Sequence, residues 1–169
     1  AWLLDGESGV LDSIHAGLGI LKISDGRFEE IFEEQLGGWF SSYGPIPAIA
    51  SGMIGSRQGW CEAQYIECPA GLEELAKKLS KVTTPSGNTL NIVPGMNNWE
   101  NGIPDVMRGE ETQVAGVMEN NDANALYILP GTHSKWVIVR NRKIESFRTF
   151  MSGELFSVLV EHSILGRMM

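Results

Sequence analysis

The hydrophobic pattern of the chain opens with two strand-like runs, at 1–5 and 13–21. A segment that contains Gly6 and Gly9 separates them, and glycines between two apolar runs are typical of a turn. We therefore predict a β-hairpin, with the chain beginning inside a sheet.

A helix is predicted over 27–39, where apolar side chains recur every three or four positions. This spacing places them on one face, which is expected to pack on the core. Asp25 is in position to cap the start of the helix, and Gly37-Gly38 is expected to weaken its end.

The middle of the chain alternates between strand-like and helical patterns. The apolar runs 48–50 and 90–93 predict strands, and leucines at helical spacing predict a helix over 72–79. A glycine-punctuated loop occupies 51–60, and the stretch 94–104, PGMNNWENGIP, has the composition of turns throughout. The strand–helix–strand rhythm indicates an α/β fold.

A helix, three strands and a final helix are predicted for the remainder. The helix covers 110–118, and strand-like runs at 126–129, 135–139 and 144–150 are separated by short turns, which favours a β-meander. Ser152 is a candidate N-cap of the last helix. The apolar face of that helix comprises Leu155, Val158, Leu159 and Leu165.

The composition is that of a globular protein and narrows the range of partners. Of the 169 residues, 43% are hydrophobic and 20% are charged, with a formal net charge of −8. Nucleic-acid binding depends on clustered Lys and Arg, so we expect no nucleic acid as partner. The chain has no apolar run of membrane-spanning length and no signal-peptide pattern, which favours the cytoplasm. Cys61 and Cys68 lack the spacing of a zinc site and are expected to be reduced thiols.

The first candidate for chemistry is the segment PGTHSKW at 130–136, between two predicted strands. Its glycine permits a tight turn, and the following residues can direct successive backbone N–H groups and two hydroxyls at an anion. The spacing of a Walker loop is absent, and an ordinary hairpin turn would explain the same residues. The residues assigned to phosphate and nucleotide binding are Gly131, Thr132, His133, Ser134 and Lys135.

Adjacent carboxylates, Glu110 and Glu111, lie at the predicted start of a helix within the segment MRGEETQ. Acidic residues there complement the helix dipole, which by itself accounts for them. A kinase that acts on a hydroxyl also benefits from a carboxylate that accepts the hydroxyl proton. Both residues are therefore candidate catalytic groups, with Arg108 beside them.

The third candidate is the loop SGMIGSRQGW at 51–60, which follows a predicted strand. Its small residues allow close approach of the backbone to a ligand, and its Arg and Gln supply donors suited to a carboxylate or to sugar hydroxyls. A glycine-rich connector with a surface arginine is the alternative interpretation. The residues assigned to substrate binding are Ser51, Gly52, Met53, Arg57, Gln58 and Arg108.

Taken together, these segments resemble the 2-dehydro-3-deoxygalactonokinase family of the sugar kinase, actin and Hsp70 superfamily. The segments are ASGMIGSRQGWCEAQYIECPA, PDVMRGEETQ, LPGTHSKWV and FRTFMSGELF, and their order and separation are similar to those of the family. The resemblance implies ATP-dependent phosphorylation of the terminal hydroxyl of a 2-keto-3-deoxy sugar acid, with Mg²⁺, in galactonate catabolism. Carried over by position, Glu110 is the base, with Glu111 as the alternative. No residue is assigned to the metal.

The resemblance also implies a ribonuclease-H-like lobe over 1–119 and the beginning of a second such lobe over 120–169, with the boundary near 119–124. Family members open with an aspartate and a Gly-Thr turn before the segment that matches AWLLDG, and they continue beyond SILGRMM. We therefore expect an internal fragment of a longer kinase. The oligomeric state stays open between a monomer and a homo-oligomer.

Two alternatives remain at this point. The first is a related kinase that acts on another sugar acid or on a polyol, for which the arginine of SRQGW would lack a carboxylate partner. The second is a sugar-acid binding module without catalytic activity, which retains the cleft and has lost nucleotide use.

Overall fold

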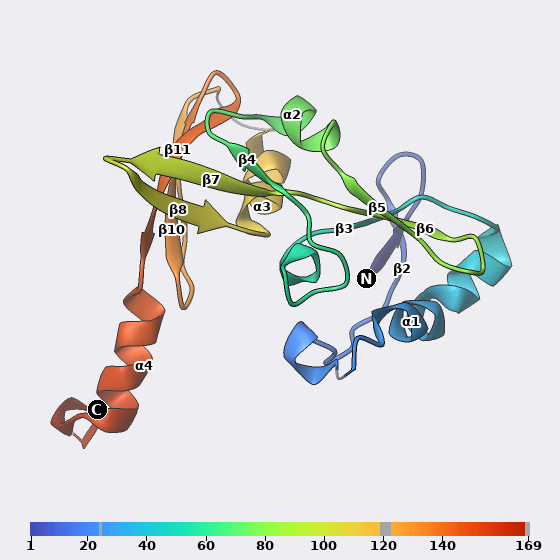
Figure 1. Cartoon of the computed structure of the whole chain (residues 1–169), viewed down its shortest axis with the longest axis horizontal. Helices are drawn as coiled ribbons and strands as arrows, with labels where there is room; N and C mark the ends of the chain where they lie inside the picture. The colour runs from blue at the N-terminus through green and yellow to red at the C-terminus, as the bar shows by residue number, and fades with distance from the viewer. Residues whose placement is uncertain (24, 119–122, 168–169) are drawn as a thin grey trace.

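The computed structural model describes residues 1–23, 25–118 and 123–167, and it shows a mixed α/β fold of small sheets and helices (Figure 1). Within these ranges the α-helices are α1 (Phe28–Tyr43), α2 (Leu72–Ala76), α3 (Glu110–Met118) and α4 (Ser152–His162). The short 3₁₀ helices are η1 (Ile20–Lys22), η2 (Met53–Gly55) and η3 (Ile164–Arg167). None of the helices in these ranges is long and apolar enough to cross a membrane.

The strands form four small sheets. The first is the antiparallel pair β1 (Trp2–Leu4) and β2 (Val10–Ser13). The second has the order β3 (Ala48–Ala50), β6 (Thr89–Ile92) and β5 (Ser80–Thr83), and the third has the order β4 (Tyr65–Glu67), β7 (Gly95–Glu100) and β8 (Ile103–Met107). The fourth is the antiparallel meander β9 (Ala125–Leu129), β10 (Ser134–Arg140) and β11 (Lys143–Phe150), as predicted.

The opening hairpin is confirmed, but its second strand begins earlier than the predicted run 13–21. Asp5 explains the tight turn, because its Oδ1 accepts the N–H groups of Glu7 at 2.8 Å and Gly9 at 2.7 Å. The chain is thereby reversed soon after β1, and Leu4 lies opposite Val10. Of the predicted run, only Ser13 belongs to the strand.

The first helix is confirmed, but both predictions about its ends are wrong. The N-cap is Arg27, without a side-chain hydrogen bond, so Asp25 does not cap it. The helix continues through Gly37-Gly38 and ends at Tyr43, with Gly44, whose φ is 73°, as its C-cap. A glycine costs a helix only about 1 kcal/mol, and the apolar packing of Phe40 on Phe32, with ring centroids 5.5 Å apart, offsets part of that cost.

The stretch 94–104 was expected to be turn throughout, and this prediction is wrong. It contains β7 and the start of β8, which pair antiparallel around Asn101 and Gly102, both with positive φ. The sequence does not show the apolar alternation of a strand here, because Met96 is the one central residue of β7 that is fully buried. The second helix is also shorter than predicted, since it ends at Ala76.

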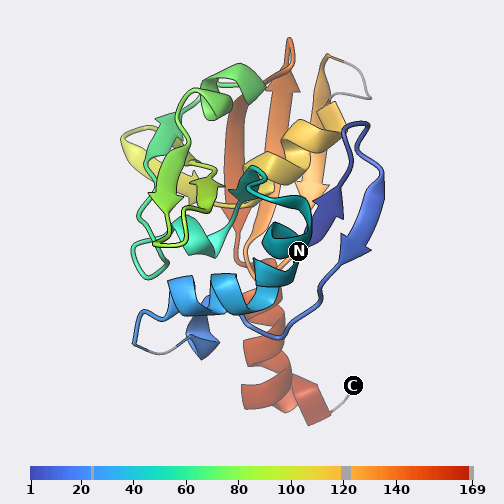
Figure 2. The ribbon, with the colours of Figure 1, turned by 90° about the vertical axis from the view of Figure 1, so that its right-hand side faces the viewer.

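The last helix forms where predicted, but Ser152 is its first residue, and the N-cap position belongs to Met151. Figures 1 and 2 show α4 extending away from the sheets. Of the four residues predicted to form its apolar face, Leu165 lies beyond the helix, in η3. Each of the four is at least 44% exposed, so that face has no cover within the described ranges.

The larger hydrophobic core lies between the meander, the β7–β8 hairpin and α3. Its fully buried side chains include Met96, Met107, Val114, Val137 and Phe147. The cluster therefore combines residues from both sides of the predicted domain boundary. That boundary falls largely on 119–122, which lie outside the described residues, so the division into lobes stays a prediction.

The Phe147→Ala substitution should destabilise the protein by roughly 3–5 kcal/mol, because a buried ring is removed from a packed core. Urea unfolding measures this change, and Leu21→Ala is the control, since Leu21 is 92% exposed. Equal losses for the two variants would contradict the assigned core.

Candidate active site

Three turns from distant parts of the sequence line one cavity of about 600 Å³. The first turn, 51–53, follows β3. The second, 108–110, joins β8 to α3, and the third, 131–133, joins β9 to β10. The cavity thus brings together part of each of the three candidate segments.

Two glycines allow the first two turns to meet. Gly52 has φ 89° and Gly109 has φ 113°, conformations that other residues rarely adopt. A Cβ on Gly109 would lie 3.2 Å from the Cα of Gly52, so the two backbones are in direct contact. This contact defines one wall of the cavity.

The two adjacent glutamates occupy different environments. Glu111 is fully buried, and both of its carboxylate oxygens accept the N–H of Gly109, at 2.9 and 2.7 Å. Burial raises the pKa of the Glu111 carboxyl, against the opposing effect of the hydrogen bonds that it accepts. Glu110 lines the cavity, and its Oε2 accepts the N–H of Arg108 at 3.0 Å. Of the pair, Glu110 is the carboxylate in reach of a ligand.

The Gly-Thr-His turn is fixed on the first turn of α4. The carbonyl of Thr132 accepts the N–H of Glu154 at 3.1 Å, and the hydroxyls of Ser134 and Ser152 lie 2.5 Å apart. Ser134 is buried, and its Oγ also accepts the N–H of Gly131 at 3.3 Å. Among the described residues, the N–H groups of Thr132 and His133 have no acceptor, so they are free to bind an anion.

Lys135 is not among the residues that line the cavity, although it follows the turn directly. Its side chain is buried, and its Nζ donates to Val106 O and to Thr149 Oγ1, both at 2.6 Å. The predicted contact of this ammonium with phosphate therefore has no support in the geometry.

Arg108 lies at the edge of the cavity and is held by neighbouring groups. Its Nη2 donates to Ala63 O at 2.8 Å, and its guanidinium lies 4.3 Å from the centre of the Tyr65 ring. Within the described ranges, its Nε and Nη1 are buried without a hydrogen-bond partner.

Arg57 and Gln58 are exposed and are not among the residues that line this cavity. The loop folds back after η2, because Ile54 O accepts the N–H of Trp60 and Gly55 O accepts that of Ala63, both at 2.9 Å. This reversal leaves the two side chains at the tip of the loop.

Sequence reasoning missed several residues that line the cavity, including Thr112, Gln113 and Pro130. Thr112 and Gln113 belong to the candidate segment MRGEETQ, and Pro130 belongs to PGTHSKW. Because Thr112 and Gln113 lie in the first turn of α3 beside Glu110, their position was the signal that could have identified them. Among the described residues, no group of three or more His, Cys, Asp or Glu side chains could hold a metal ion.

We expect Gly153→Ala to destabilise the protein by roughly 1–3 kcal/mol through overpacking. The added Cβ would lie 2.4 Å from Gly131 O and 2.8 Å from Thr132 Cα, so the 131–133 turn must move. Gly116→Ala in α3 is the matched control, because its Cβ would meet nothing within 4 Å, and it should stabilise by about 0.5–1 kcal/mol. Thermal unfolding compares the two, and a stable Gly153→Ala variant would refute the seating of the turn.

The raised pKa of Glu111 predicts a dependence of stability on pH. Because the folded state holds this proton more tightly than the unfolded state, the free energy of unfolding should fall as pH rises above the ordinary value of 4.5 and through the folded pKa. Glu111→Gln cannot ionise and should show less of this decline in urea unfolding measured at several pH values. Glu73→Gln, at an exposed site, should behave as the parent, and parallel curves for all three proteins would contradict the effect of burial.

The family model for 2-keto-3-deoxy-galactonokinase matches residues 1–169. The chain is 38% identical over 165 residues to the Rhizobium meliloti (strain 1021) protein named "Probable 2-dehydro-3-deoxygalactonokinase DgoK1", covering 97% of this chain and 53% of the relative. It is 34% identical over 166 residues to the 2-dehydro-3-deoxygalactonokinase of Escherichia coli (strain K12), covering 98% of this chain and 54% of the relative.

A crystal structure assigned as a 2-dehydro-3-deoxygalactonokinase protein from Sinorhizobium meliloti superposes with a TM-score of 0.89 at 38% identity, over 98% of this chain and 55% of that one. The chain spans about half the length of the curated relatives it matches. The match to the family model over all 169 residues, with these relatives, shows that the chain belongs to the 2-keto-3-deoxy-galactonokinase family.

Proposed function

We propose that the protein carrying this chain transfers the γ-phosphoryl group of ATP to the terminal hydroxyl of 2-dehydro-3-deoxy-D-galactonate. The observation that carries this proposal is that Glu110 and the 131–133 turn line the same cavity. Family membership and the names of the relatives support the same reaction. The two substrates are small molecules, and neither nucleic acid nor membrane is a proposed partner.

Glu110 is the proposed base. In the transfer, the hydroxyl oxygen of the acceptor forms a bond to the γ-phosphorus while the bond from that phosphorus to the bridging oxygen of ADP breaks. The hydroxyl proton passes to the Glu110 carboxylate, and ADP leaves. Glu110 suits this role better than Glu111, because Glu111 is buried and bonded to the Gly109 N–H.

The turn 131–133 is the proposed phosphate contact. Thr132 and His133 line the cavity, and their turn is hydrogen-bonded to α4. Successive backbone N–H groups in such a turn are suited to binding a phosphate. Ser134 contributes by shaping the turn, since its hydroxyl is bonded within it. Mg²⁺ would neutralise phosphate charge during the transfer, but the described residues offer no metal cluster, so we assign it no ligand.

The acceptor side of the cavity is proposed to be the turn 51–53 with Arg108. Arg57 and Gln58 lie outside the cavity, at the tip of the same loop. A sugar acid would contact them if it extended beyond the cavity or if the loop moved toward it.

We also propose that the chain is divided into a ribonuclease-H-like lobe over 1–119 and the beginning of a second such lobe over 120–169. The proposed location is the cytoplasm.

The Glu110→Gln variant of the intact protein tests the proposal. Its kcat should fall by roughly 10² to 10⁴, with little change in KM for the sugar acid, because proton acceptance is lost while binding is kept. Glu73→Gln is the control, since Glu73 also lies in the first turn of a helix but is exposed on α2.

Substrate identity is tested in the same assay with a panel of 2-keto-3-deoxy acids and polyols. If the protein phosphorylates another acid or a polyol in preference, that compound replaces 2-dehydro-3-deoxy-D-galactonate as the proposed acceptor. A parent protein that binds the acid without binding ATP would indicate a module without catalytic activity. Near-normal turnover by Glu110→Gln would remove Glu110 as the base.

A further inference from the structure

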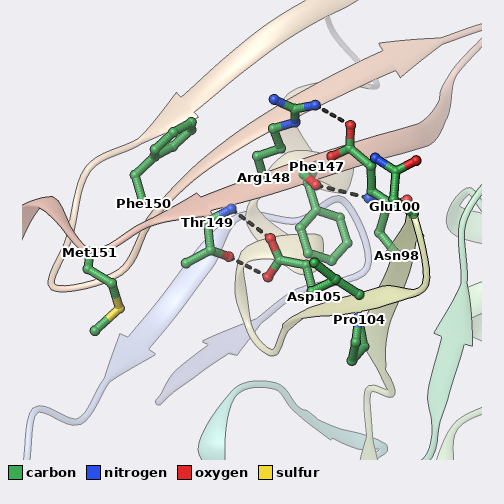
Figure 3. A pocket seen from close by; sticks show the side chains of 11 residues that line it. Asn98, Glu100, Pro104, Asp105, Phe147, Arg148, Thr149, Phe150 and Met151 are labelled. Carbon is green, nitrogen blue, oxygen red and sulfur yellow. Dashed lines mark hydrogen bonds and ion pairs between the residues drawn. The ribbon is translucent and has the colours of Figure 1, made fainter.

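A polar cluster of one buried and two half-buried residues joins three strands whose ends lead to the cavity. It consists of Asp105 on β8, Lys135 on β10 and Thr149 on β11, and Figure 3 shows the two bonds between Asp105 and Thr149. Asp105 Oδ2 accepts the Thr149 N–H at 2.7 Å, and Asp105 Oδ1 accepts the Thr149 hydroxyl at 2.6 Å. The same hydroxyl accepts a bond from Lys135 Nζ at 2.6 Å, and the ammonium lies 3.9 Å from Asp105 Oδ1.

The ammonium of Lys135 is buried and hydrogen-bonded within this cluster and to the adjoining strand β8. Its residue is only 5% exposed, and its ammonium also donates to the carbonyl of Val106 at 2.6 Å. A buried charge is tolerated only where it is paired and hydrogen-bonded, and removal of one partner is costly. This environment accounts for a lysine whose side chain points away from the phosphate turn.

Each member of the cluster lies just before or after a wall of the cavity. The strand of Asp105 ends at Met107, directly before Arg108 of the cavity, and Lys135 follows Ser134 at the end of the 131–133 turn. The strand of Thr149 ends at Phe150, shortly before Ser152 and Gly153 of α4, on which that turn is seated. The cluster also crosses between two sheets, because β8 belongs to the β4–β7–β8 sheet and the other two strands belong to the meander.

The larger hydrophobic core packs between the same two sheets, and two further polar contacts join them. Arg148 and Glu100 form an exposed ion pair, and exposed pairs contribute little. Asn98 Nδ2 donates to Phe147 O at 3.1 Å, near the middle of β7. The Asp105–Lys135–Thr149 cluster is thus placed to set how far the end of β8 lies from the start of β10.

We infer that Asp105, Lys135 and Thr149 form a positioning network that fixes the distance between Glu110 and the 131–133 turn. The inference rests on the proposed function and names residues that would align its two substrates. Reacting atoms must be held within about 3–3.5 Å of each other, and a misplacement of about 1 Å can cost roughly 10² in rate. The network acts through Glu110 and the turn and does not touch either substrate.

Lys135→Met in the intact protein tests this inference, with Lys143→Met as matched control. Lys143 also pairs with a carboxylate, at 2.5 Å from Glu74 Oε1, but it is half-exposed and is not among the residues that line the cavity. In Lys135→Met, kcat should fall by roughly 10 to 10², with KM for ATP and for the sugar acid within about twofold of the parent. Hydrogen exchange of the hydrogen-bonded amides at the two turns should rise together by about tenfold or more. These amides are those of Arg108 and Gly109 at the 108–110 turn, and of Gly131 and Glu154 at the 131–133 turn.

A second pair of variants separates the hydroxyl from packing and remains usable if Lys135→Met does not fold. Thr149→Val keeps the shape of the side chain and removes the hydroxyl, so it should show the same fall in kcat and the same paired rise in exchange. Thr149→Ser keeps the hydroxyl and should restore both readouts to near the parent. Lys143→Met should change neither.

Three results would overturn the inference. A large rise in KM for ATP with unchanged exchange would make Lys135 a phosphate ligand. A lower midpoint of thermal unfolding with normal kcat and normal exchange at both turns would make the network purely structural. Additive losses of kcat when Lys135→Met is combined with Glu110→Gln would show that Lys135 does not act through Glu110. If the parent phosphorylates no sugar acid, the proposed function fails separately, and the exchange measurement still decides whether the network holds both turns.

Discussion

The contact between Gly52 and Gly109 is the constraint on which the architecture of the cavity depends. Both residues have positive φ, and their backbones approach so closely that a side chain on Gly109 would press on Gly52. Because the turn at Gly109 points its N–H at the carboxylate of Glu111, the same geometry buries one glutamate and leaves the other at the cavity. The different positions of Glu110, at the cavity, and Glu111, buried, are thus tied to the backbone conformation of a single glycine.

Buried polar groups hold the remaining walls in place. Glu111, Lys135 and Ser134 are each at most 6% exposed, and each is hydrogen-bonded to a segment that lines or supports the cavity. Such groups are costly unless satisfied, so they favour one arrangement of the surrounding turns over others. These three buried residues therefore bear on the shape of the cavity in which the reaction is proposed to take place.

The sequence predicted the elements whose pattern is local. The meander, α1 and α3 follow from apolar periodicity, and the glycines between apolar runs located the three turns. The β7–β8 hairpin was missed because its polar residues resemble a turn, while its pairing depends on a partner strand and on the burial of Met96 and Met107. The continuation of α1 through Gly37-Gly38 was missed for a related reason, since Phe40 packs against a cluster that includes Leu90 and Ile92, from a distant strand.

The sequence by itself determined the α/β class, the family and the three segments that meet at the cavity, because these depend on residue type and order along the chain. Only the tertiary structure decided which members of each segment face the cavity. Glu110 lines it while Glu111 is buried, the turn at 131–133 lines it while Lys135 points into the network of Asp105 and Thr149, and Arg57 lies outside it. Neighbouring residues in a turn or strand point in different directions, and which direction is interior depends on packing between segments that are distant in the sequence.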